Sequence, residues 1–86
     1  MMKLIPLGSN KTLLRIASYE VLFSYQTPVA GYKRGVGWFR TEKKYSRTTS
    51  KHINSYLGNC EAISVTQSWI DNLVAVETSH IEDLVK

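Results

Sequence analysis

The spacing of apolar residues changes once along this chain, and that change constrains its fold more than any other feature. From Tyr19 to Tyr25, apolar side chains alternate with Glu20 and Ser24, which is the period-two pattern of a β-strand. After Ser46, apolar residues recur every three to four positions, as they do on one face of a helix. This order predicts an α+β domain in which the sheet precedes the helices.

Turn residues divide the first half into strands. Thr12–Ile16 is a plausible strand before the alternating one. Pro28 follows the alternating strand, at a position typical of a strand start or a sheet edge. Val29–Tyr32 and Val36–Thr41 flank Lys33–Gly35, a short connection with a glycine that is typical of a hairpin. We therefore predict a small antiparallel sheet of three to four strands in sequence order.

The second half predicts two helices. The first begins at a cap on Ser46 or Thr48 and ends at Gly58, where a glycine can adopt the left-handed conformation. The second begins near Thr66. Ser79–Glu82 matches a capping box, so the last residues form a short third helix or extend the second.

The predicted helices need an apolar surface to pack on. We expect both of them on one face of the sheet, within a single domain of residues 1–86. Val74–Val76 could instead form a short strand. The expected core includes several tyrosines and the larger aromatic residues Phe23, Trp38, Phe39 and Trp69.

A strongly basic segment occupies the middle of the chain. Lys33–Lys51 contains seven basic residues and one acidic residue, whereas Glu61–Lys86 has a net charge of −4. Such asymmetry affects partners and association rates rather than the fold. Along the predicted helix, Lys44, Arg47 and Lys51 fall on one side, either as a binding surface or as a solvated face with incidental charge. The candidate residues for binding nucleic acid or another acidic partner are Lys33, Arg34, Arg40, Lys43, Lys44, Arg47, Lys51 and Asn54.

Exposed aromatic rings would add a stacking surface for single-stranded nucleic acid. Tyr32, Trp38 and Tyr45 are the candidates, provided that they lie on an uncovered face of the sheet. For Trp38 we expect burial in the core.

The sequence contains no pattern typical of catalysis or of a bound metal. His52 and His80 are far apart and lack the spacing of metal ligands. Cys60 lies near His52 in the sequence, but no feature marks an activated thiol or an oxyanion hole. We therefore expect a protein that is not an enzyme, with no catalytic residue, no metal and no cofactor.

The same composition bears on location and assembly. A single cysteine suits a reducing compartment, and no run approaches the roughly 20 apolar residues of a membrane span, so we expect a cytoplasmic protein with no membrane partner. A small core and unpaired sheet edges favour self-association. We expect a homodimer with two-fold symmetry, with a plain monomer as the alternative.

Two stretches of the chain, Ser24–Ala30 and Phe39–Asn54, follow the patterns S-Y-x-T-x-V-A and T-x-K-x-[YW]-S-x-T-T-[ST]-[KR]-H-x-N. In these stretches the chain resembles a widespread family of short, functionally uncharacterised proteins of bacteriophages and prophages. Val65–Asp71 also looks like the start of that family's closing helix, and Glu42 stands where the family often has proline. The resemblance implies a viral origin, and hence the cytoplasm of a host cell, but it implies no activity or site.

The basic segment and the resemblance lead to two hypotheses from different classes. The first is a non-enzymatic, phage-type accessory protein whose basic hairpin and helix face binds nucleic acid or a nucleoprotein complex. The alternative is an anti-defence inhibitor, for example an anti-CRISPR-like protein, that docks on a host protein complex. The second rests on an analogy at the level of gene class, because small phage proteins often have such roles.

Overall fold

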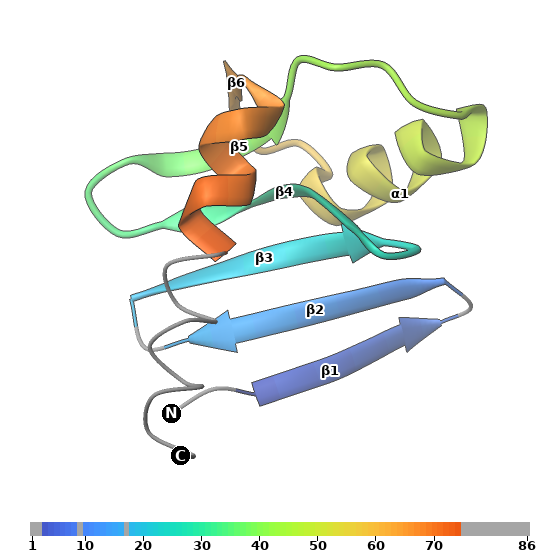
Figure 1. Cartoon of the computed structure of the whole chain (residues 1–86), viewed down its shortest axis with the longest axis horizontal. Helices are drawn as coiled ribbons and strands as arrows, with labels where there is room; N and C mark the ends of the chain where they lie inside the picture. The colour runs from blue at the N-terminus through green and yellow to red at the C-terminus, as the bar shows by residue number, and fades with distance from the viewer. Residues whose placement is uncertain (1–2, 9, 17, 75–86) are drawn as a thin grey trace.

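The computed structural model describes residues 3–8, 10–16 and 18–74, which form one sheet with a helix on each face (Figure 1). Its six strands lie in sequence order across the sheet. Neighbouring strands are antiparallel, except that β6 runs parallel to β5. The strands are β1 (Lys3–Gly8), β2 (Lys11–Ile16), β3 (Tyr19–Ser24), β4 (Thr27–Lys33), β5 (Gly37–Thr41) and β6 (Ile63–Val65).

Two helices accompany this sheet in the described part of the chain. The helix α1 (Arg47–Leu57) connects β5 to β6, and residues 67–74 form a helix after β6. A parallel pair of strands needs such a crossover, since the chain must return to the same end of the sheet before it can pair again. No helix among these residues has the length and apolar character needed to cross a membrane.

The prediction of three to four antiparallel strands is wrong, although the chain remains an α+β domain. The outer strands β1 and β6 were missed. β1 is largely exposed and contains Pro6. Because it buries no face, its sequence lacks the alternation of apolar and polar residues that predicts a strand. β6 has only three residues, and it becomes a strand because α1 carries the chain back beside β5.

The prediction that both helices pack on one face is also wrong. The neighbouring β3 residues Val21 and Leu22 point to opposite faces, and both are completely buried. Each face of the central sheet therefore needs its own cover. On one face, the α1 layer consists of Leu13, Leu22, Val29, Ala30, Ile53 and Leu57. On the other face, the core cluster consists of Tyr19, Val21, Phe39 and Ile70.

Among the aromatic residues expected in the core, Phe39 is completely buried. Its ring occupies the space left by the missing side chain of Gly31 in β4. Gly31 of β4 pairs with Phe39 on one side and with Val21 on the other. A Cβ atom at Gly31 would lie 2.6 Å from Cζ of Phe39 and would meet the backbone oxygen of Glu20. Only glycine fits at this position.

The helix ends follow the predicted caps. Ser46 is the N-cap of α1, where its hydroxyl accepts a hydrogen bond from the backbone N–H of Thr49. Gly58 ends this helix with φ of 57°. Thr66 caps the helix of residues 67–74 in the same way, through the backbone N–H of Trp69.

These boundaries settle three details of the sequence interpretation. Because α1 begins at Arg47, Lys44 lies in the preceding loop, and its predicted place on the helix is wrong. Val74 is helical, whereas the rest of the alternative strand Val74–Val76 lies outside the described residues. The possible capping box at Ser79–Glu82, with its histidine, also lies outside them.

Candidate nucleic-acid interface

The predicted basic residues occupy both ends of β5. Lys33 and Arg34 lie at the hairpin between β4 and β5, whereas Lys43 and Lys44 lie in the loop that follows β5. Figure 1 shows these connections at opposite ends of the strand. A strand of five residues separates the two groups by roughly 17 Å. The backbone N–H of Arg34 donates to the backbone oxygen of Ser18 at 2.9 Å, which holds the hairpin against the β2–β3 turn.

The helix α1 connects these two ends. Its residues Arg47, Lys51 and Asn54 are all exposed and recur at helical spacing. The opposite face carries Ile53 and Leu57, which are buried in the α1 layer. Since α1 returns the chain from the end of β5 to the start of β6, the exposed row runs back towards the hairpin end. We call the row Arg47, Lys51 and Asn54, together with Lys43 and Lys44, the basic face.

No cation of the basic face has an ion-pair partner in the described part of the chain. The ion pair found there joins Arg15 to Glu20 and involves none of the predicted residues. Nζ of Lys43 lies 5.2 Å from the centre of the Tyr45 ring, which is within the range of a cation–π contact.

Arg40 differs from the other candidates. It is half-buried in β5, between Ala30 of β4 and Ser64 of β6. It shares the α1 side of the sheet with Trp38, two residues earlier. The structure therefore places Arg40 beside the basic face rather than within its exposed row.

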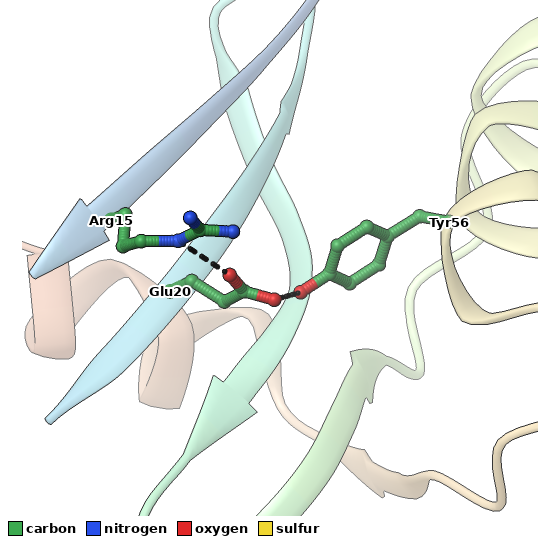
Figure 2. A network of polar contacts seen from close by, with 3 residues as sticks. All are labelled: Arg15, Glu20 and Tyr56. Carbon is green, nitrogen blue, oxygen red and sulfur yellow. Dashed lines mark hydrogen bonds and ion pairs between the residues drawn. The ribbon is translucent and has the colours of Figure 1, made fainter. Parts of the chain in front are cut away.

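A polar network that the sequence interpretation missed lies near the hairpin end (Figure 2). One oxygen of Glu20 accepts from Nε of Arg15 at 3.2 Å, and its other oxygen accepts from the Tyr56 hydroxyl at 2.8 Å. Burial of the ring, followed by the neighbouring Glu20 carboxylate, raises the pKa of Tyr56 far above its ordinary range. The cross-strand pairing of Arg15 with Glu20 could have been found from the β2–β3 hairpin, but the contact with α1 could not.

Three aromatic rings from different elements meet beside this network. We call Tyr32 of β4, Trp38 of β5 and Tyr56 of α1 the aromatic row. Tyr32 and Trp38 have ring centres 4.9 Å apart at 60°, and Trp38 and Tyr56 have ring centres 5.8 Å apart at 70°. Trp38 is half-buried against the α1 layer, while Tyr32 remains 37% exposed. The sheet therefore presents one aromatic ring to solvent at this point.

A second group of polar contacts anchors the first turns of α1 to the end of β3. The Ser24 hydroxyl lies 3.0 Å from the Thr49 hydroxyl and 2.8 Å from Nδ1 of His52. A serine beside a histidine is also the arrangement of an activated nucleophile. However, Ser24 is only 2% exposed, so its hydroxyl cannot reach a substrate. The contacts orient α1 on the sheet rather than forming a catalytic pair.

The remaining reactive side chains are scattered. Cys60 is an exposed free cysteine in the loop after α1. Among the residues that the structure describes, no three His, Cys, Asp or Glu side chains gather in a way that could hold a metal ion. Within the described residues, the basic face and the aromatic row are therefore the surface features that we consider for binding.

Comparisons with known proteins place the chain in a family without assigning it a role. The model of the family of unknown function DUF8033 matches residues 2–72, from the start of β1 into the helix after β6. No curated protein and no solved structure matches the chain. Because the match spans most of the 86 residues, the chain belongs to this family.

Proposed function

We propose that this member of the DUF8033 family is a non-enzymatic accessory protein that binds nucleic acid, alone or in a nucleoprotein complex, through its basic face. The protein acts in the cytoplasm. A phage or prophage origin is part of the proposal, and its support is the resemblance carried by Ser24–Ala30 and Phe39–Asn54.

The proposal rests on the exposure of the cations on α1 and in the loop before it, and on their lack of an acidic partner among the described residues. Lys43, Lys44, Arg47 and Lys51 are all exposed. They have no acidic partner within the described residues, since the ion pair found there is between Arg15 and Glu20. A basic surface whose charges have no acidic partner among the described residues attracts phosphate groups, and its binding releases their counterions.

The polar side chains around these cations suit contacts with a phosphate backbone. Asn54 continues the exposed row of α1, and Ser50 lies exposed beside Lys51. Amide and hydroxyl groups donate to phosphate oxygens and set the register of a bound strand, while Lys and Arg supply most of the sequence-independent affinity.

The salt dependence of binding tests this proposal. With four cations engaged, the logarithm of the association constant should fall against the logarithm of the salt concentration with a slope of roughly −3. The measurement is fluorescence anisotropy of labelled DNA and RNA at several salt concentrations. Lys51→Ala should reduce the slope by about one unit and weaken binding to every sequence similarly.

The matched control is Lys3→Ala, because Lys3 is also an exposed lysine but lies on β1, at the far edge of the sheet. Both variants remove one positive charge, so an effect of net charge alone would be equal in the two. Equal slopes for Lys51→Ala and Lys3→Ala would place the contact elsewhere. No binding to DNA or RNA at low salt would overturn the proposal and favour an anti-defence inhibitor that docks on a host protein complex.

A further inference from the structure

We propose that the bound nucleic acid is single-stranded and that one of its bases stacks on Tyr32 of the aromatic row. This inference rests on the proposed function, because the basic face is required to hold the strand. It specifies the class of ligand, and it adds a contact at Tyr32, which is not one of the predicted basic residues.

The geometry of the row prepares Tyr32 for stacking. Trp38 packs against the α1 layer and contacts Tyr56 of α1 on its other side. The edge-to-face contact with Trp38, at 4.9 Å between ring centres, then supports the Tyr32 ring. Tyr32 nevertheless remains 37% exposed. A ring that is supported by its neighbours and open to solvent loses little conformational entropy when a base stacks on it.

The position of the row connects it to the positive charges. Lys33 and Arg34 follow Tyr32 directly at the hairpin. On the other side, Lys51 of the basic face precedes Tyr56 by five residues, which is about 7.5 Å along a helix axis. Five residues also turn about 140° around the helix, so a strand that follows the exposed row of α1 crosses the helix to reach the aromatic row, whereas the hairpin cations directly follow Tyr32 in the chain.

The Glu20 carboxylate beside the row does not oppose this binding mode. Its two oxygens are engaged by Nε of Arg15 and by the hydroxyl of Tyr56. Arg15 balances its negative charge within the network, and 55% of the Arg15 side chain remains exposed. The Glu20 carboxylate therefore adds no unpaired negative charge next to the row.

The same features favour a single strand over a duplex. In a duplex the bases stack on one another, and their faces are not available to a protein ring. In a single strand the faces are free, and stacking on an aromatic side chain tolerates any base.

The test compares three ligands by fluorescence anisotropy: a short thymidine oligonucleotide, the same oligonucleotide with abasic sites, and a duplex of equal length. Wild-type protein should bind the thymidine strand most tightly. Tyr32→Ala should weaken that binding about 5- to 150-fold and leave the salt slope unchanged. Tyr32→Phe should bind like the wild type, because the ring is retained. The abasic strand should not distinguish Tyr32→Ala from the wild type.

Tyr25→Ala is the matched control, because Tyr25 is also exposed but lies in the turn after β3, away from the row. It should leave the affinity unchanged. If Lys51→Ala weakens binding while Tyr32→Ala does not, the stacking site is refuted and the proposed function stands. Duplex binding as tight as single-strand binding would also refute the inference. If no ligand binds, the proposed function and this inference both fall.

Discussion

Replacement of Gly31 by alanine tests the packing on which this sheet depends. Gly31 lies in β4 between Val21 and Phe39 and is fully inside the sheet. Its φ is not positive, so alanine brings no left-handed strain. The new methyl group would lie 2.6 Å from Cζ of Phe39, 3.1 Å from the Val21 Cα, and against the backbone oxygen of Glu20. The cost of the substitution is therefore steric.

The size of the stability loss in Gly31→Ala depends on the atoms that would have to move. Overpacking of a core costs roughly 1–3 kcal/mol when side chains can shift. Here two of the obstacles are backbone atoms of β3, which move only if β3 and β4 separate. Alanine also restricts the unfolded chain, but this stabilises the folded protein by only about 0.4–1 kcal/mol. We expect a net loss of about 3 kcal/mol, which is a large part of the roughly 5 kcal/mol available to a small domain.

The assay is urea denaturation followed by tryptophan fluorescence, together with a thermal melt. A loss of about 3 kcal/mol should lower the melting temperature by roughly 12–24 °C in a domain of this size. Gly35→Ala is the control, since Gly35 lies in the hairpin with open space around it. Its φ of 88° gives only backbone strain, with an expected loss of about 1–2 kcal/mol.

A double variant separates the two sources of the clash. Adding Phe39→Leu to Gly31→Ala removes the ring atom but leaves the Glu20 oxygen in place, so it should not restore stability. Restoration by Phe39→Leu would show that the ring alone sets the requirement for glycine. If Gly31→Ala is no less stable than Gly35→Ala, the close approach of β3 and β4 is refuted.

Three further predictions concern the network at the hairpin end, the anchoring of α1 and the sheet edge. Tyr56→Phe should lose about 1–2 kcal/mol at neutral pH. Because burial raises the pKa of Tyr56 above its ordinary value of about 10, only the unfolded chain ionises there just above pH 10. The advantage of the wild type over this variant should therefore shrink as pH rises past 10 in urea denaturation, and a constant difference would contradict the reasoning. Ser24→Ala should lose about 1–3 kcal/mol because it removes the buried hydroxyl that hydrogen-bonds both the Thr49 hydroxyl and Nδ1 of His52, whereas the exposed Ser50→Ala should be nearly neutral in the same assay. Light scattering at tens of micromolar should detect a dimer, and Leu4→Lys on the exposed edge strand β1 should return the 9.8 kDa monomer; monomer alone in the wild type would refute this expectation.

Local sequence patterns determined much of the middle of this protein. The alternation from Tyr19 onward predicted β3, although Tyr25 lies in the following turn with φ of 58°. Ser46, Gly58 and Thr66 predicted the helix ends, because caps depend on backbone groups within a few residues. The exposed row of α1 follows from helical periodicity in the same way.

The tertiary structure alone decided how these elements cover one another. Periodicity identified the apolar face of each helix, but it could not show that one packs on the Leu22 side of the sheet and the other on the Val21 side. It also missed β6, which pairs with β5 only after α1 has crossed the sheet. The aromatic row and the Glu20 network each join residues of three elements. Such contacts depend on the packing of segments distant in sequence, whereas a periodic pattern records only whether each residue faces the core.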